Sequence, residues 1–251
     1  MTQNRHSVER VRHELKRREL IVRRVRRLTP QMLRVTLAGE ALQGFVSAAP
    51  DDHVKVFFPG SGGEPAARDY TPRRYDAQSL ELDLDFVLHG DGPAAQWAAS
   101  AQPGQRLVIG GPRGSFVVSD DFDWYLLLGD ETALPAIGRR LEELRAATRV
   151  QVIIEVADAA EQQPLHSRAR LEVTWLHRGA GEPGQAEPLV GALSALSLPP
   201  GEGYAWIAGE SQVARALREH LVHQRGLSKS CVKAAGYWKR GAVATHETHN
   251  D

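Results

Sequence analysis

The strongest constraint on the fold is a change in the hydrophobic pattern near residue 123. Before it, short β-branched segments at residues 19–25, 33–37, 54–58, 80–88 and 107–109 are separated by Gly, Pro and Asp, and residues 80–86 alternate strictly. After it, apolar strand patterns at 124–128, 150–156, 171–176 and 204–208 alternate with helical patterns at 134–146, 189–196 and 212–224. The first pattern predicts an antiparallel barrel or sandwich, and the second a parallel sheet with crossover helices. We therefore expect two domains that meet within residues 119–123.

Composition narrows the functional classes. A chain of 251 residues with 42% hydrophobic content has room for two domains, and its net charge of zero does not favour nucleic-acid binding. Cys231 is the only cysteine, which excludes an intramolecular disulfide and a cysteine-ligated iron-sulfur cluster. No apolar run approaches the ~20 residues of a membrane helix, and the Arg-rich start lacks the apolar core of a secretory signal. We expect a cytoplasmic protein that does not insert into a membrane.

The beginning of the chain is basic. Only Glu9, Glu14 and Glu19 are acidic in the stretch that contains Arg5, Arg10, Arg12, Lys16, Arg17, Arg18, Arg23, Arg24, Arg26 and Arg27. We expect a basic arm over residues 1–18, read as a solvated helix face that leads into the first strand, with a nucleic-acid or lipid contact as the alternative. A patch containing Arg12, Arg17 and Arg18 is a further candidate, as a docking site for an acidic electron carrier.

Residues 68–73 read Arg-Asp-Tyr-Thr-Pro-Arg and suit a flavin nucleotide. In an extended segment we expect Arg68, Tyr70 and Thr71 to project to one side, where they hold a phosphate, a flat ring and a ring-edge polar atom. The alternative is a plain strand in which Arg68 pairs with Asp69 and Tyr70 simply packs.

Six motifs occur in a fixed order along nearly the whole chain. They are residues 68–73, residues 85–90 (Asp-Phe-Val-Leu-His-Gly), residues 111–116 (Gly-Pro-Arg-Gly-Ser-Phe), residues 129–136 (Gly-Asp-Glu-Thr-Ala-Leu-Pro-Ala), residues 208–210 (Ala-Gly-Glu) and residues 236–241 (Gly-Tyr-Trp-Lys-Arg-Gly). Together they resemble the ferredoxin-NADP reductase superfamily and, within it, the siderophore-interacting protein family of flavin-dependent ferric-siderophore reductases. The resemblance implies an antiparallel β-barrel FAD-binding domain over residues 19–120. It also implies a parallel-sheet α/β NAD(P)-binding domain over residues 121–251, which ends in an aromatic and basic segment.

The resemblance also assigns the flavin site. It places Arg68 at the diphosphate, Tyr70 on the flavin face and Thr71 near the ring N5. The rest of the expected FAD set is Asp85, Val87, His89, Ala94, Ala95 and Gln96, around a turn whose following helix start would point N–H groups at an anion. Ala95 stands where the family commonly has Ser, so we expect FAD to lose one hydrogen bond, worth ~1 kcal/mol. On its own, His89 would be read as a capping or packing residue.

The resemblance assigns the turn after the first parallel strand, with Gly129, Asp130 and Thr132, to the nicotinamide side of the site, and it places Trp238 near the flavin. The alternative for the turn is an ordinary helix cap by Asp130 or Thr132. The second parallel strand ends in Glu-Val-Ala-Asp at residues 155–158, and an acid there would repel a 2′-phosphate and accept a ribose hydroxyl. We therefore predict that NADH is used at least as well as NADPH. Residues 179–188 are expected to form a mobile loop, and whether it closes over the nucleotide is left open.

The implied substrate is a bulky, often anionic ferric siderophore, which needs cations beside the flavin edge. Lys55, Lys239 and Arg240 are the candidates, and with Thr71 they form the expected catalytic set; a solvent-facing Lys55 and a simple basic pair near the end are the alternatives. Electrons would pass from NADH or NADPH through FAD to Fe(III), and the siderophore would release Fe(II). The rival hypotheses are ferredoxin as the donor, another ferric chelate as the acceptor, or a non-catalytic siderophore-binding protein. We expect a monomer. We also expect no metal site of its own, since His220 and His223 lack a metal-binding motif.

Overall fold

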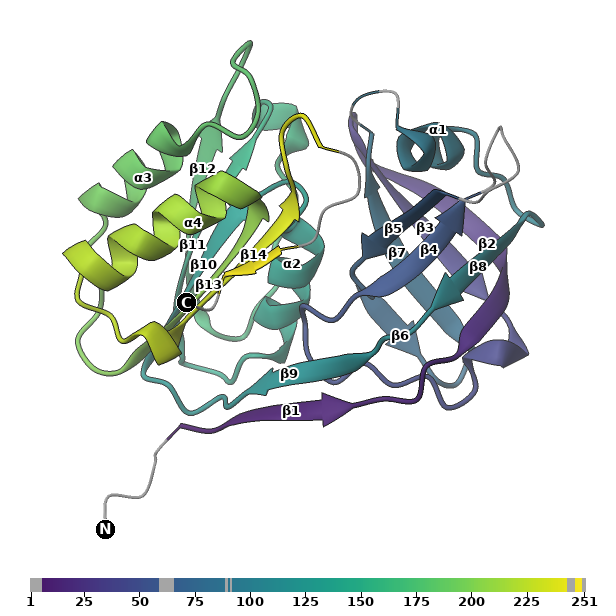
Figure 1. Cartoon of the computed structure of the whole chain (residues 1–251), viewed down its shortest axis with the longest axis horizontal. Coiled ribbons are helices and arrows are strands. Elements are labelled where there is room, and N and C mark those ends of the chain that lie inside the picture. Colours follow the sequence, from purple (N-terminus) through teal and green to yellow (C-terminus); the bar gives the residue numbers. More distant parts are fainter. Residues whose placement is uncertain (1–5, 59–65, 89, 91, 243–246, 250–251) are drawn as a thin grey trace. The chain divides into compact units, whose positions relative to one another are not determined.

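The computed structural model describes residues 6–58, 66–88, 90, 92–242 and 247–249 (Figure 1). The chain separates into two compact units, Met1–Ser119 and Asp120–Asp251. None of the described helices is long and apolar enough to cross a membrane.

The first unit is built on a curled antiparallel sheet of seven strands. In spatial order they are β5 (Ala66–Tyr70), β4 (Val54–Phe58), β8 (Arg106–Gly110), β2 (Arg17–Thr29), β3 (Met32–Ala38), β7 (Glu81–Val87) and β6 (Arg74–Asp76). The short elements of this unit are η1 (Glu40–Leu42) and α1 (Pro93–Ala99). The predicted antiparallel β domain is confirmed.

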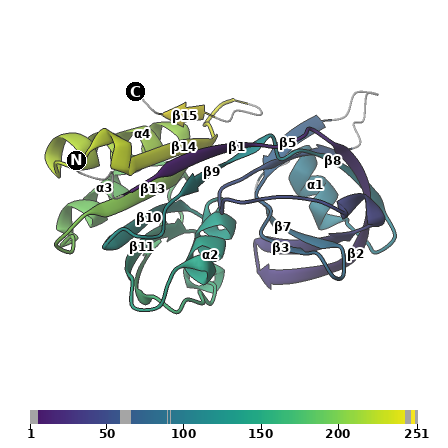
Figure 2. The same cartoon turned by 90° about the horizontal axis from the view of Figure 1, so that it is seen from below.

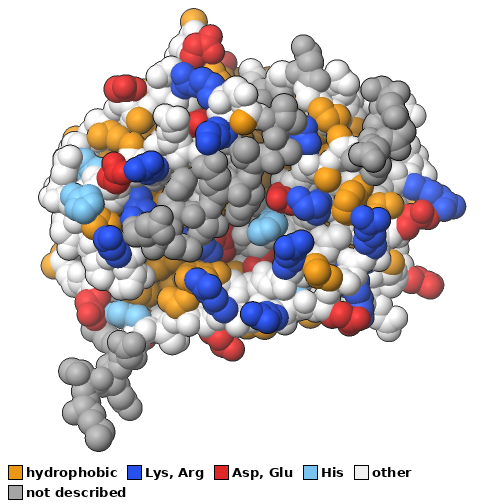
Figure 3. All heavy atoms as spheres, in the orientation of Figure 1, with side chains coloured by type: hydrophobic (Ala, Val, Ile, Leu, Met, Phe, Trp, Pro, Cys, Tyr) orange, Lys and Arg blue, Asp and Glu red, His pale blue; other side chains and the backbone are white. Residues whose placement is uncertain are grey.

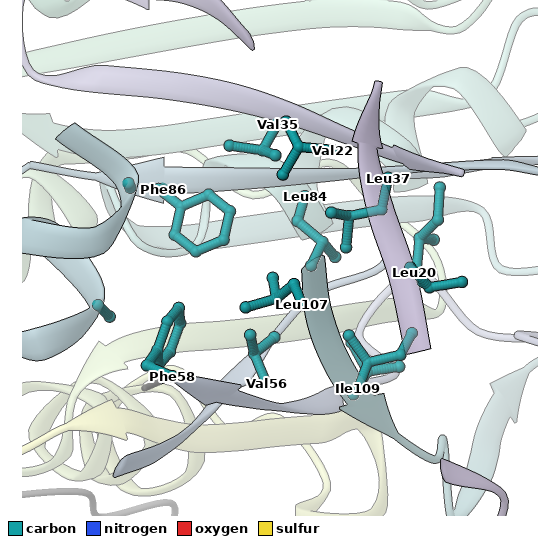
Figure 4. Close-up of a cluster of buried hydrophobic side chains, with 14 of the residues drawn as sticks. Leu20, Val22, Val35, Leu37, Val56, Phe58, Leu84, Phe86, Leu107 and Ile109 are labelled. Atoms are coloured by element: carbon teal, nitrogen blue, oxygen red, sulfur yellow. The ribbon is translucent and has the colours of Figure 1, made fainter. Parts of the chain in front are cut away.

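Strand β7 shows why the alternating pattern folds this way. Leu82, Leu84 and Phe86 are completely buried and lie on the inner face of the sheet among the apolar side chains of Figure 4. Asp83 and Asp85 lie on the opposite face, where they bond to Thr36 and Arg34 of the neighbouring strand. A period of two thus separates the core face from a face of paired polar groups.

The basic arm is a strand, so the expected helix is wrong. β1 (Val8–Arg12) pairs antiparallel with β9 (Gly114–Val118), and Arg10 lies opposite Phe116 with its guanidinium carbon 5.6 Å from the ring centroid. A short isolated helix is marginal in water, whereas pairing with β9 satisfies the backbone and adds a cation–π contact. The partner strand lies about a hundred residues away along the chain, where helical propensity gives no sign of it.

The second unit is a six-stranded sheet. Its order is β12 (Arg170–His177), β11 (Arg149–Val156), β10 (Trp124–Asp130), β13 (Gly203–Glu210), β14 (Val232–Trp238) and β15 (Glu247–His249). The first five strands are parallel, and four of them, β12, β11, β10 and β13, were predicted; β15 is antiparallel to β14. Strand β14 was missed because Val-Lys-Ala-Ala-Gly is poor in β-branched residues, which are the usual signal of a strand.

Helices cover both faces of this sheet. α3 (Ala186–Ala195) and α4 (Ser211–Glu219) pack together on one face and α2 (Leu134–Glu143) lies on the other (Figure 2). A π-helical turn (His220–Gln224) continues α4, and the remaining short turns are η2 (Ala159–Glu161) and η4 (Lys229–Cys231). The loop expected over residues 179–188 ends earlier, at Gln185, because α3 begins at Ala186. Pro188 fits in its first turn, where its missing N–H has no helical acceptor.

Candidate functional site

Polar side chains gather at one edge of the parallel sheet. Asp130 ends β10, Glu155 is the last residue but one of β11, Arg178 follows β12, Glu210 ends β13 and Trp238 ends β14. The carboxyl ends of parallel strands meet at one edge, which is where open α/β sheets bind ligands. These side chains belong to three groups, which are held together by hydrogen bonds and ion pairs.

The central group joins the residues expected on the nicotinamide side. Trp238 Nε1 donates to Asp130 Oδ2 (2.8 Å), and the backbone N–H of Thr132 donates to Asp130 Oδ1 (2.9 Å). Burial is the main reason that the pKa of Asp130 is raised, and the neighbouring Glu131 carboxylate raises it further. Neither Asp130 nor Thr132 is the N-cap of α2, which is Ala133. The structure therefore brings Asp130, Thr132 and Trp238 together, although they are up to 108 residues apart.

Gly129 lets this turn sit tightly against β13. A Cβ at this position would lie 2.4 Å from the carbonyl oxygen of Ala208 and 2.5 Å from the Cβ of Ala133. Both distances are shorter than any real contact, so a side chain would push the turn away from the sheet. Gly129 shapes the site through its backbone alone.

The second group is an arginine clamped by carboxylates. Arg178 Nη1 donates to Glu131 Oε2 (2.9 Å), Nη2 bonds to Glu131 Oε1, and Nη1 lies 3.6 Å from Glu155 Oε1. Burial raises the pKa of Glu155 to about 7, aided by Asp130 and Glu131 and opposed by Arg178. Sequence reasoning pointed to the acidic end of β11, at residues 155–158, but did not include Glu131 or Arg178 among the site residues. The position of Arg178 directly after a predicted parallel strand was the available signal.

The third group fastens the 179–185 loop to the end of β14. Arg240 Nη2 donates to the carbonyls of Pro183 (3.1 Å) and Gly184, while the Arg240 backbone N–H donates to Glu210 Oε1 (3.2 Å). Gly184 has a φ of +77°, and a Cβ there would lie 2.8 Å from Glu210 Cγ and 2.9 Å from Trp238 Cη2. The guanidinium of Arg240, expected to meet the substrate, therefore holds a loop. Lys239 is half-buried beside it.

The acidic end of β11 has a structural role as well. Asp158 Oδ1 accepts from the N–H of Ala160 (2.7 Å) and caps η2. One of the two carboxylates expected near the ribose, that of Asp158, is thus already bonded to its own turn.

In the first unit, Arg68 and Tyr70 share one face of β5. They lie opposite Val56 and Val54 in the β4 register. The Tyr70 ring packs on Phe86, with centroids 4.3 Å apart and planes at 37°, and burial raises the pKa of its phenol. Strand β5 ends at Tyr70, so the alternation that places Arg68 and Tyr70 on one face does not extend to Thr71, which follows the strand with only 7% of its surface exposed.

Lys55 lies on the other face of the same strands. Its ammonium bonds to Asp69 Oδ1 (2.8 Å), directly opposite in register, so Arg68 and Asp69 face different sides and do not pair as the plain-strand alternative required. The side chain of Lys55 is 46% exposed, and an exposed pair of this kind contributes only about 0–1 kcal/mol. The structure therefore separates Lys55 from the face that carries Arg68 and Tyr70.

The other residues expected to contact the flavin differ in how buried their side chains are and in whether they are already bonded. The carboxylate of Asp85 is held by Arg34 at 2.6 and 2.8 Å and its side chain is 2% exposed, so it joins β3 to β7. Val87 is half-buried at the end of β7. In α1, Ala94 belongs to the core, Ala95 is half-buried and Gln96 is exposed. His89 lies outside the described residues.

The donor set of residues 68–71 fits a flavin nucleotide. Among the described residues, the Arg68 guanidinium donates only to the carbonyl of Ala67 (2.8 Å), which leaves most of its five N–H groups for a diphosphate. Tyr70 is half-buried and is supported by Phe86, an arrangement that suits a ring stacked on the remaining surface. Within the described ranges, no group of three or more His, Cys, Asp or Glu residues is placed to hold a metal ion.

The basic arm does not present all of its arginines to solvent. Arg18 is 5% exposed, its Nη1 donates to the carbonyl of Gly111 (3.0 Å), and its guanidinium carbon is 5.3 Å from the Phe45 ring centroid. Arg18 therefore cannot be part of the suggested docking patch. Figure 3 shows Lys and Arg side chains spread over the face in view, with acidic side chains beside several of them.

Comparison with known proteins agrees with this architecture. Residues 122–241 match the model of the siderophore-interacting protein family, and residues 21–67 and 60–116 match that of the siderophore-interacting FAD-binding domain. The chain is 36% identical to the NADPH-dependent ferric-chelate reductase of Escherichia coli, over 92% of this chain and 96% of the relative. It is 35% identical to the ferric vibriobactin reductase ViuB of Vibrio cholerae, over 85% and 86%.

A solved structure extends the comparison to three dimensions. The crystal structure of a siderophore utilization protein from T. fusca is similar to this chain with a TM-score of 0.89 and 41% identity, covering 96% of this chain and 98% of that one. The matches to the family model and to the FAD-binding domain model together cover most of the chain. The chain therefore belongs to the siderophore-interacting protein family.

Proposed function

We propose that the protein is an FAD-dependent ferric-siderophore reductase that takes electrons from NADH or NADPH and releases Fe(II). The observation that carries the proposal is the donor set of β5, where the half-buried Tyr70 ring and the Arg68 guanidinium share one face. The relatives named as ferric-chelate and ferric vibriobactin reductases support the same activity. We place the reaction in the cytoplasm, where pyridine nucleotides are available and Cys231 stays reduced.

The protein's own residues bind and orient the flavin nucleotide. Arg68 holds the diphosphate with a fixed fork of donors, Tyr70 supports the ring, and Thr71 donates to the ring edge. Val87, His89, Ala94, Ala95 and Gln96 complete the contacts, with no hydroxyl at Ala95. Asp85 contributes indirectly, because its ion pair with Arg34 fixes the end of β7.

The second unit binds the pyridine nucleotide at the edge formed by Gly129, Asp130, Thr132 and Trp238. The Trp238–Asp130 hydrogen bond holds the indole in one orientation. FAD, when bound, accepts a hydride and delivers single electrons, which a pyridine nucleotide alone cannot do. The carboxylates at this edge support the expectation that NADH serves at least as well as NADPH, although one relative is named for NADPH.

Ferric siderophore is the substrate, and Lys239 and Arg240 attract its anionic ligand groups. Lys55 lies on the face of β4 away from Tyr70, so its charge draws the anion towards the protein without meeting it at the flavin ring. Lys55 is tied to Asp69 by an exposed ion pair that another anion can replace at little cost. Arg240 donates to neutral carbonyls, and a carboxylate or catecholate is a stronger acceptor than these. After reduction, the softer Fe(II) leaves the chelator.

The test is the visible spectrum of the purified protein after incubation with FAD, recorded anaerobically before and after NADH or NADPH. Bound flavin bleached by a nucleotide and reoxidised by a ferric siderophore supports the proposal. Flavin that neither nucleotide reduces would point to ferredoxin as the donor, and a protein that binds siderophore but no FAD would be a non-catalytic binder. Sedimentation of the same sample would check the expected monomer.

A further inference from the structure

The clamp around Arg178 has an unusual charge balance. Arg178 bonds to Glu131 and lies near Glu155, and the carboxylate of Asp130 adds a third negative charge that acts on both Arg178 and Glu155. The side chains of Glu131 and Arg178 are 12% and 10% exposed, and that of Glu155 is 3% exposed. Charges that are this well buried interact strongly and are screened little by salt.

The environment of Glu155 also indicates that the negative charge of this cluster is not fully compensated. The Oε2 atom of Glu155 is fully buried and has no hydrogen-bond partner within the part of the chain that the structure describes, while Oε1 is 3.6 Å from Arg178 Nη1. A buried ionised carboxylate without full compensation is costly, and a proton removes that cost. Arg178, Asp130 and Glu131 are the charged groups that face Glu155, and burial together with the two carboxylates raises its pKa to about 7.

The clamp lies where an α/β sheet distinguishes the two pyridine nucleotides. The N–H of Arg178 donates to the carbonyl of Val156 (3.1 Å), which places it beside the end of the second parallel strand. That strand end contacts the adenosine ribose in many such folds, with an acid selecting the hydroxyl and an arginine the 2′-phosphate. Here the arginine is present but is held by Glu131.

We propose that Glu131 and Glu155 couple the choice between NADH and NADPH to the uptake of a proton. While both carboxylates hold Arg178, this edge of the parallel sheet favours NADH. The 2′-phosphate of NADPH pairs with Arg178 only when Glu155 gains a proton from water. This inference rests on the proposed function. When Arg178 turns to the phosphate, Glu131 loses its bidentate partner and Glu155 loses its nearest positive charge. The proton on Glu155 then offsets the negative charge that is left behind.

The binding test uses the full chain with FAD and adenosine 2′,5′-bisphosphate, with 5′-AMP as the probe that lacks the 2′-phosphate. Calorimetry in buffers of different ionisation enthalpy, between about pH 7 and about pH 8.5 where the phosphate stays a dianion, measures proton uptake on binding. We expect uptake approaching one proton for the bisphosphate and none for 5′-AMP. The affinity of the protein for the bisphosphate should fall by up to about tenfold for each unit that the pH rises across this range.

Variants separate the roles of the two carboxylates. Glu155→Gln should abolish proton uptake and flatten the pH dependence, and Glu131→Gln should raise the NADPH-to-NADH ratio of kcat/KM by about tenfold or more. Arg178→Gln should remove the contact with the 2′-phosphate, so that the bisphosphate binds no more tightly than 5′-AMP, while NADH still reduces the flavin. Glu219→Gln, which breaks the exposed pair of Glu219 with Arg215 on α4, is the matched control and should behave as the unmodified protein.

The outcomes divide clearly. Bisphosphate binding without proton uptake, or a ratio in Glu131→Gln within about twofold of the unmodified protein, overturns the proton-linked choice. Flavin that neither nucleotide reduces at any pH overturns the proposed function, whereas the calorimetry decides the inference. A loss of NADH activity in Arg178→Gln equal to its loss of NADPH activity would show that Arg178 only supports the fold.

Discussion

Ser115 donates a 2.6 Å hydrogen bond from its hydroxyl to Oδ2 of the buried Asp52. The same hydroxyl oxygen lies 2.7 Å from His13 Nε2 and accepts from the N–H of Ala48 (3.1 Å). One serine of the Gly-Pro-Arg-Gly-Ser-Phe motif thus ties β9 to the segment that follows η1 and to the chain between β1 and β2. Because the hydroxyl already donates to a carboxylate, this Ser, His and Asp group is a structural network and not a nucleophile with its base.

Ser115→Ala is expected to lower the free energy of unfolding by about 1–3 kcal/mol, since Asp52 is 4% exposed and would lose a charge-assisted hydrogen bond. Urea denaturation of the full chain measures this. Ser228→Ala removes an exposed Ser228–Ser230 contact and is the control, with an expected change near zero. Equal effects of the two substitutions would contradict a structural role for the network.

Trp238→Phe keeps an aromatic ring and removes the N–H that bonds to Asp130 Oδ2. We expect a loss of about 1–3 kcal/mol in the free energy of unfolding, because a buried carboxylate oxygen is left without its donor. Flavin reduction by NADH should also slow while FAD affinity is retained, which stopped-flow absorbance and a flavin titration can separate. A variant that weakens FAD binding and leaves the reduction rate unchanged would refute this arrangement.

Glu155 predicts a pH dependence of stability. Its pKa is raised from 4.5 to about 7 on folding, so the folded state binds more protons than the unfolded state in that interval. Stability from this group is therefore fully present below about pH 4.5 and is lost as the pH rises through about 7. The difference in unfolding free energy between the unmodified protein and Glu155→Gln should fall across this window, and a difference that rises with pH would contradict the prediction.

Arg68→Gln tests the flavin site. Loss of a charge-assisted contact with a diphosphate is worth about 1.5–3 kcal/mol, so the FAD dissociation constant should rise by about 10- to 100-fold without loss of folded protein. Fluorescence titration with FAD measures the constant. Arg74→Gln, which breaks the exposed Arg74–Asp76 pair on β6, serves as the control and should bind FAD normally.

Local sequence patterns were sufficient to predict most of the strands of the two units. The strict alternation of residues 80–86 predicts which face of β7 is buried, and the apolar run at 150–156 predicts a strand covered on both faces. Both predictions follow from local patterns: alternation with a period of two for a strand buried on one face, and an uninterrupted apolar run for a strand buried on both faces. The grouping of Arg68 with Tyr70 on one face is also local, because alternation in a strand requires it.

What the sequence by itself determined is therefore the two kinds of sheet and the residue types available at their edges, since these depend on periodicity and composition. Only the tertiary structure decided that β1 is a strand, that Lys55 pairs with Asp69 on the face away from Tyr70, and that Arg18 is buried. It also joined Glu131 to Arg178, and Asp130 to Trp238, across 47 and 108 residues. These contacts depend on which strands become neighbours, and strand neighbours are chosen by the packing of the whole unit rather than by any local segment.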